Sequence, residues 1–107
     1  MEVPLEIDVT EAARLASQPE YLLLDVREPH EYTECHVPGS LHIPMGQIPD
    51  RVADLPADRH ILVLCRSGAR SLRVTQFLRA NEHPLASNIA GGILAWAETA
   101  GPELARD

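Results

Sequence analysis

The stretch His60-Ile61-Leu62-Val63-Leu64-Cys65-Arg66-Ser67-Gly68-Ala69-Arg70-Ser71 decides the fold of this chain. Its apolar run at 61–64 is typical of a strand that is buried on both faces of a parallel sheet. A helix is expected from Ala69 to about Asn81, because apolar side chains recur there on one side, namely Val74, Phe77 and Leu78. A strand, a short loop with a glycine and a helix predict an α/β unit with Cys65 at the carboxyl end of the strand.

The flanking sequence predicts more units of the same kind. Strands are expected at 21–26, 41–43 and 85–89, and helical segments at about 10–16, at 27–32, within 44–55 and after Gly91-Gly92. Strands that alternate with helices predict a mainly parallel sheet with helices on both faces. Such sheets usually bind ligands in the crevice at the carboxyl ends of their strands. Cys65 is therefore expected in that crevice.

Composition limits what the protein can do. At 107 residues the chain fits one domain, 1–107, and its 45% hydrophobic content suffices for a core. The formal net charge of −7 argues against a nucleic-acid partner and against an anionic membrane surface. The sequence has no signal-peptide pattern and no apolar stretch of about 20 residues, so we expect a cytoplasmic protein. Two cysteines in a domain of this size indicate free thiols, not a disulfide framework.

The surroundings of Cys65 favour a reactive thiolate. Backbone N–H groups and the positive end of the following helix converge where the strand ends, and Arg66 and Arg70 add positive charge. A thiolate is the nucleophilic form of cysteine, and cationic surroundings stabilise it. An isolated buried cysteine is usually inert, so the arginines and the glycine are what favour catalysis.

Four segments in the same order resemble the rhodanese family of sulfurtransferases. Leu24-Asp25-Val26-Arg27 with Glu28 and Glu31 resembles the first strand and acidic turn of that family. The stretch 32–43 resembles its pattern of an aromatic residue, three further residues, then His, an aliphatic residue, Pro and Gly. The segment 65–71 resembles its active-site loop, and Gly91-Gly92-Ile93-Leu94-Ala95-Trp96 resembles its closing helix. The resemblance spans almost the whole chain and implies a five-stranded rhodanese-like fold.

This resemblance implies that Cys65 takes a sulfane sulfur from a donor such as thiosulfate, becomes a persulfide and passes the sulfur to a thiol or to cyanide. The expected binding residues are those of the loop: Arg66, Ser67, Gly68, Ala69, Arg70 and Ser71. Their N–H groups and hydroxyls would stabilise the anionic persulfide, and the two arginines would attract an anionic donor. A thioredoxin-like or other protein could also serve as the acceptor. No organic cofactor or metal is implied, because Cys35, His36, His42 and Cys65 lack zinc-site spacing.

Two other functions remain open on the sequence. A carrier or sensing module that hands its persulfide to one partner protein would have almost the same sequence. A cysteine phosphatase or arsenate reductase of this fold would need a Cys-x5-Arg loop, whereas four residues separate Cys65 from Arg70. The shorter loop suits a single sulfur atom better than a tetrahedral oxyanion, so sulfur transfer is favoured.

The remaining chemically interesting residues have structural explanations that we favour. Asp25 is expected to pair with Arg27 or a turn N–H, and His36 to pack in a Pro-Gly turn. Cys35 is expected to be a free thiol, with a disulfide to Cys65 as the minority hypothesis. Trp96 and its neighbours Ile93 and Leu94 are expected in the core, and Arg73 and Arg79 on a solvated helix face.

Overall fold

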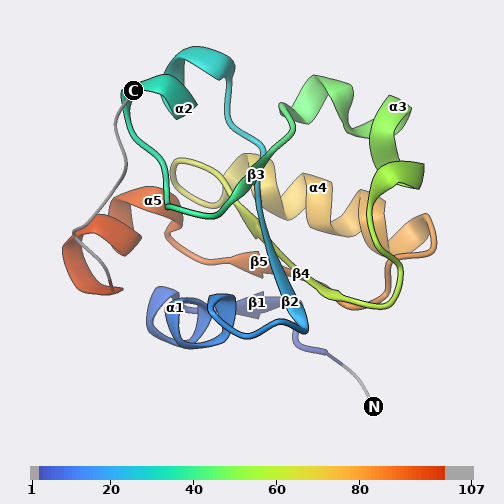
Figure 1. Ribbon diagram of the computed structural model, residues 1–107, viewed down its shortest axis with the longest axis horizontal. Helices are drawn as coiled ribbons and strands as arrows, with labels where there is room; N and C mark the ends of the chain where they lie inside the picture. Colours follow the sequence, from blue (N-terminus) through green and yellow to red (C-terminus); the bar gives the residue numbers. More distant parts are fainter. Residues whose placement is uncertain (1–2, 101–107) are drawn as a thin grey trace.

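A computed structural model describes residues 3–100 of the chain. Its sheet has five strands in the order β1-β5-β4-β2-β3, and every neighbouring pair is parallel (Figure 1). The strands are β1 (Glu6–Ile7), β2 (Tyr21–Asp25), β3 (Leu41–His42), β4 (His60–Leu64) and β5 (Ala86–Ile89). The α/β class and the five-stranded parallel sheet are thereby confirmed, and the apolar run before Cys65 forms the central strand.

Helices and helical turns connect the strands. They are α1 (Val9–Ala16), α2 (Pro29–Glu34), η1 (Met45–Gln47), α3 (Ile48–Arg51), η2 (Val52–Asp54), α4 (Ala69–Ala80), α5 (Gly92–Ala95) and the π-helical turn η3 (Trp96–Ala100). The first helix is capped by Asp8, whose carboxylate accepts the backbone N–H of Glu11 at 2.8 Å. Within residues 3–100, no helix has the length and hydropathy needed to cross a membrane.

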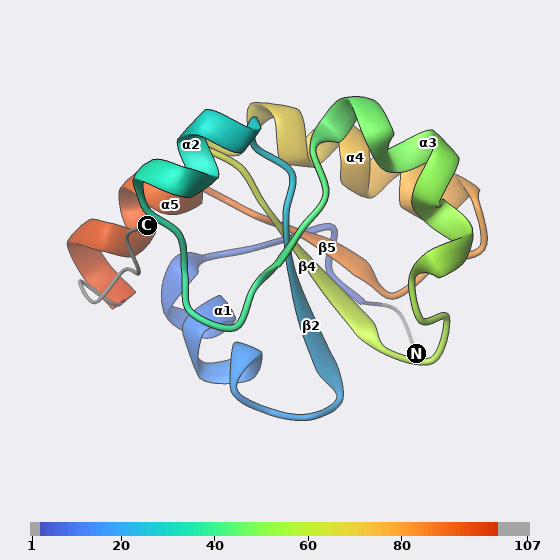
Figure 2. The same ribbon diagram turned by 45° about the horizontal axis from the view of Figure 1, so that its top comes forward.

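Two hydrophobic cores lie on opposite faces of the sheet. Alternate side chains of β4 enter different cores, with Ile61 and Val63 on one face and Leu62 and Leu64 on the other. The first core is closed by α3 and α4, and the second by α1 and α5 (Figure 2). The prediction of helices on both faces is therefore confirmed. The short helix α2 instead lies at the end of the sheet where β2 and β4 finish (Figure 1).

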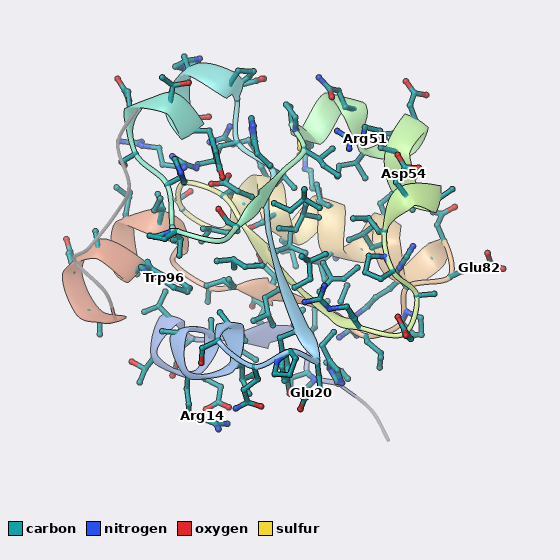
Figure 3. The ribbon with its side chains drawn as sticks, viewed as in Figure 1. Arg14, Glu20, Arg51, Asp54, Glu82 and Trp96 are labelled. Carbon is teal, nitrogen blue, oxygen red and sulfur yellow. The ribbon has the colours of Figure 1, made fainter. Side chains whose placement is uncertain are left out.

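The closing helix packs as expected except at one residue. Trp96 and Ile93 are each 5% exposed, and Trp96, the first residue of η3, lies in the same core as the buried residues of α1 (Figure 3). Leu94 is 46% exposed, so the expectation that it belongs to the core was wrong. Only one side of this short helix faces the sheet, and Leu94 falls on the other side.

Two further features differ from the sequence prediction. β1 has only two residues, too few for a periodic pattern, and it forms because Glu6 and Ile7 pair with Asn88 and Ile89 of β5. Arg79 does not lie on a solvated face as expected. Its guanidinium donates to the carbonyl of Ala86 at 2.8 Å and to that of Val3 at 2.7 Å, and so it ties α4 to the chain around β5.

Candidate active site

The central strand delivers Cys65 to the carboxyl end of the sheet. Cys65 follows the last residue of β4, where Leu64 pairs with Asp25 of β2, and α4 begins at Ala69. Gly68 precedes that helix with φ of 108°, a left-handed conformation that disfavours other residues. The chain can therefore turn within three residues, from Arg66 to Gly68, and the loop closes around the sulfur.

Hydrogen-bond donors converge on the sulfur of Cys65. The backbone N–H of Gly68 lies 3.1 Å from Sγ, and the Ser71 hydroxyl lies 3.2 Å from it. Burial of Cys65, which is 1% exposed, raises the pKa of its thiol. Hydrogen bonds from the Ser71 hydroxyl and from the backbone of Ser71, Gly68 and Ser67 outweigh burial, so the net pKa of Cys65 is lowered. The site thus favours the thiolate although the residue is buried.

The Gly91-Gly92 turn sets the direction of the loop carbonyls. The N–H of Ile93 donates to the carbonyl of Cys65 at 2.8 Å, and the N–H of Leu94 donates to the carbonyl of Arg66 at 3.2 Å. A Cβ on Gly92 would lie 2.5 Å from the Cys65 carbonyl oxygen, so only glycine fits there. Because α5 binds these two carbonyls, the N–H groups of the loop are left to face the sulfur.

The two arginines of the loop have different surroundings. Arg70 forms two parallel hydrogen bonds with the Glu31 carboxylate of α2, at 2.8 and 2.9 Å. This contact lowers the pKa of Glu31 from its ordinary value of 4.5 to about 2 and raises that of Arg70. Arg66 is exposed and forms no ion pair with another of the residues 3–100. The charge of Arg70 is therefore partly neutralised, whereas that of Arg66 faces solvent.

A buried ion pair holds α2 in position. Arg27 is 3% exposed and binds both carboxylate oxygens of Asp25, with its Nη2 at 2.8 Å from Oδ2. The same guanidinium donates to the backbone carbonyls of Glu31 and Cys35 at 3.2 and 2.7 Å. The structural role expected for Asp25 is thereby confirmed. This pair connects β2 to α2 and so sets the place of Glu31 beside Arg70.

His36 and Cys35 take no direct part in the contacts of the Cys65 sulfur. His36 stacks on the Tyr32 ring with ring centroids 4.0 Å apart. His42 stacks on the same Tyr32 ring with centroids 4.3 Å apart. The Nδ1 of His36 hydrogen-bonds the Tyr32 carbonyl, which confirms the structural packing expected for this histidine. Both cysteines are free thiols. Among the described residues, no three His, Cys, Asp or Glu side chains gather closely enough to hold a metal ion.

The structure brings most of the predicted loop residues to the sulfur, and it adds others. Ser67, Gly68 and Ser71 interact with Cys65, whereas Arg66 and Ala69 are exposed on the outer side of the loop. Three further residues support the loop from elsewhere in the fold: Glu31, Asn88 and Gly92. The Gly-Gly pair was a visible signal of a close approach. Asn88 sits in a predicted strand and gave no signal beyond its polarity.

Comparisons with known proteins agree with this geometry. The model of the rhodanese-like domain matches residues 8–99. A sulfurtransferase of Allochromatium vinosum is 39% identical over 92 residues, which make up 86% of this chain and 86% of that protein. The crystal structure of a rhodanese-like domain protein from Staphylococcus aureus superposes with a TM-score of 0.83 at 28% identity, over 100% of this chain and 99% of that one.

A human protein extends the comparison to a sulfurtransferase of known structure. The single-domain sulfurtransferase TSTD1 has a TM-score of 0.81 at 26% identity and covers 91% of this chain and 98% of its own. The resemblance found in the sequence is thereby confirmed over nearly the whole length of the chain. This protein belongs to the rhodanese-like domain family, whose sulfurtransferase members indicate sulfur transfer as its general class of reaction.

Proposed function

We propose that the protein is a sulfurtransferase that carries a sulfane sulfur on Cys65 between a small anionic donor, such as thiosulfate, and a thiol or cyanide acceptor. The convergence of N–H and O–H donors on the Cys65 sulfur is the observation that carries this proposal. Backbone N–H groups of the loop, which stabilise a thiolate, can also stabilise the negative charge of a persulfide. Family membership supports the reaction class, and the loop geometry supports Cys65 as the nucleophile.

The first half-reaction loads the sulfur. The Cys65 thiolate attacks the outer sulfur of thiosulfate, so that a new S–S bond forms while the bond to the sulfonate sulfur breaks. Sulfite leaves with the electron pair of that bond, and the negative charge of the enzyme passes to the outer persulfide sulfur. The hydrogen bonds that lower the pKa of Cys65 favour the thiolate that this attack requires.

The second half-reaction returns the enzyme to its starting state. Cyanide or a thiolate attacks the outer sulfur, and the product is thiocyanate or a new persulfide. The Cys65 thiolate is the leaving group, so hydrogen bonds from Gly68 and Ser71 that lower its pKa also assist its departure. A thioredoxin-like protein or another protein thiol could take the place of the small acceptor.

The unequal surroundings of the arginines suggest how a donor is attracted. Arg66 is exposed and outside any ion pair of residues 3–100, so it is the cation we expect to meet the sulfonate end of the donor. Arg70 is fixed by Glu31, and its contribution is a constant positive field beside the sulfur. The cytoplasm is the compartment we propose, because its reduced thiols would supply acceptors and keep both cysteines free.

Intact-mass measurement with thiosulfate tests the proposal directly. The protein should gain the mass of one sulfur atom, cyanide should remove it as thiocyanate, and Cys65→Ser should gain nothing. Absence of the mass gain in the folded wild-type protein would refute the proposal. Loading followed by slow discharge to cyanide and dithiothreitol, but fast discharge to a protein thiol, would instead show a dedicated sulfur carrier. Hydrolysis of a phosphate ester or reduction of arsenate would favour the phosphatase or reductase hypothesis.

A further inference from the structure

A fully buried amide lies behind the loop of Cys65. Asn88 on β5 is 0% exposed, and its side chain hydrogen-bonds Ser71 of α4, so it lies on the face of the sheet that α4 covers. Its Nδ2 donates to the Glu6 carboxylate at 2.8 Å and to the Gly68 carbonyl at 3.2 Å. Both partners are pure acceptors, so the amide orientation is fixed and Oδ1 must face Ser71. Both polar atoms of this buried amide therefore have hydrogen-bond partners, which hold the side chain in one orientation.

The hydroxyl of Ser71 has two acceptors but only one hydrogen. Its Oγ lies 3.2 Å from the sulfur of Cys65 and also hydrogen-bonds Oδ1 of Asn88. An amide oxygen and a thiolate can only accept, so the hydroxyl can satisfy one of them at a time. With a neutral thiol, the S–H group can donate to Oγ while the hydroxyl donates to Asn88. With a thiolate, the Ser71 hydroxyl donates its hydrogen to the sulfur, and the buried Asn88 oxygen loses its donor.

We propose that Asn88 is a positioning residue that competes with Cys65 for the hydroxyl hydrogen of Ser71, so that this hydroxyl changes partner whenever negative charge reaches or leaves the sulfur. The inference deepens the proposed function and rests on it for its catalytic meaning. When the persulfide forms, the charge moves from Sγ to the outer sulfur, and the Ser71 hydroxyl returns to Asn88. The change of hydrogen-bond partner requires only a rotation of the Ser71 hydroxyl.

This competition restrains how strongly the thiolate is stabilised. A thiolate with a very low pKa is a weaker nucleophile, and the best attacking thiol has a pKa near the ambient pH. The charged groups around the sulfur are Arg66 and Arg70 of the loop, Glu31 against Arg70 and Glu6 against Asn88. A change of Ser71 touches none of these four groups, whereas a change of Asn88 also removes the hydrogen-bond donor of Glu6 and of the Gly68 carbonyl. The effect of the shared hydrogen is therefore obtained by changing Asn88 with and without the Ser71 hydroxyl.

Alkylation of Cys65 as a function of pH tests the proposal without any need for turnover. In a Cys35→Ser background, Asn88→Leu should lower the apparent pKa of Cys65 by about half a unit to one unit, because Ser71 then has a single acceptor. Ser71→Ala should raise it by about one unit. In the Ser71→Ala background, adding Asn88→Leu should change the apparent pKa by less than roughly 0.2 units, since its effect passes through the hydroxyl. Ser87→Ala, another buried β5 change, is the matched control and should leave the value unaltered.

Two results would overturn the proposal. One is a rise of the pKa in Asn88→Leu, and the other is an equal shift with and without the Ser71 hydroxyl; either would mean that Asn88 acts through the Gly68 backbone. Should Asn88→Leu fail to fold, carbon NMR of the wild-type protein decides. The side-chain carbonyl of Asn88 should titrate together with Cys65, and Ser71→Ala should abolish that titration; a carbonyl that does not titrate refutes the competition. A protein inactive in sulfur transfer but coupled in this way would contradict the proposed function alone.

Discussion

The two cysteines of this chain show that exposure and reactivity are set by different features. Cys35 is half-buried and directly follows α2, whereas Cys65 is 1% exposed and directly follows β4. Within residues 3–100, the Cys35 sulfur accepts no hydrogen bond, although the Cys35 carbonyl accepts from Arg27 and its backbone N–H donates to the Glu31 carbonyl. The sulfur of Cys65 accepts from Gly68 and Ser71.

Burial alone would make Cys65 the less reactive thiol, because a charged group loses hydration there. The opposite result, a lowered pKa, arises because fixed donors replace that hydration. The donors are fixed by the strand, the loop and the close approach of α5. Donor geometry around the sulfur, and not access of solvent, therefore distinguishes the candidate nucleophile.

The largest effect on activity is expected when the cysteine sulfur is replaced by the oxygen of serine. Cys65→Ser should reduce sulfur transfer from thiosulfate to cyanide by about 10³-fold or more, because a serine alcohol is a poor sulfur nucleophile. Cys35→Ser is the matched control and should keep the activity within about twofold of wild type. Steady-state thiocyanate formation measures both. A severe loss in Cys35→Ser would revive the hypothesis that Cys35 resolves the persulfide.

A change at Gly92 should displace the hydrogen-bond donors around the Cys65 sulfur while both cysteines remain. Gly92→Ala places a methyl group 2.5 Å from the Cys65 carbonyl oxygen, so the loop or α5 must move. We expect a loss of stability of about 1–3 kcal/mol and a rise in the pKa of Cys65. Denaturant unfolding measures the first effect, and pH-dependent alkylation measures the second. Alkylation of Cys35 should not change its pH dependence, and a parallel change there would point to general loosening of the fold.

A third prediction separates attraction of the donor from reactivity of the sulfur. Arg66→Ala should lower kcat/KM for thiosulfate by roughly 3- to 10-fold, because an exposed cation contributes modestly to anion binding. The alkylation pKa of Cys65 should move much less. Arg73→Ala is the matched control, being another exposed arginine, on α4 beyond the loop. Equal losses with a neutral persulfide donor would argue against a role for Arg66 in recognising negative charge.

The smallest effect is expected at the ion pair that connects the two cysteine regions. Glu31 lies on α2, the helix directly before Cys35, and it holds Arg70 beside the Cys65 loop. Its pKa in the folded protein is lowered from 4.5 to about 2. The pair therefore contributes stability above the unfolded pKa, and this contribution is lost as pH falls toward about 2.

Glu31→Gln should accordingly cost about 1 kcal/mol of unfolding free energy at pH 7, since both side chains are only partly exposed. The difference from wild type should shrink between pH 4.5 and about 2. Denaturant unfolding at several pH values measures it. A difference that stays constant over this range would mean that Glu31 contributes through packing and not through its charge.

The strand–loop–helix unit could be predicted because its determinants are local. A continuous apolar run, a glycine and an apolar stripe of period 3.6 describe β4, the loop and α4 without reference to the rest of the chain. The alternation of such units then predicts a parallel sheet with Cys65 at its carboxyl end. The core positions of Trp96 and Ile93 followed in the same way, whereas Leu94 failed because a four-residue helix carries too little periodicity.

The α/β fold, the place of Cys65 and the length of its loop could all be predicted from the sequence, because they depend on neighbouring residues and on their order. The groups that meet at that loop are visible only in the folded chain: Glu31 against Arg70, Asn88 against Ser71 and Gly92 against the Cys65 carbonyl. These partners are 17 to 39 residues apart where hydrogen bonds join them, and no local pattern encodes such pairings. They come together because parallel strands bring distant segments to one edge of the sheet, where their charges and hydrogen bonds set the chemistry of one sulfur.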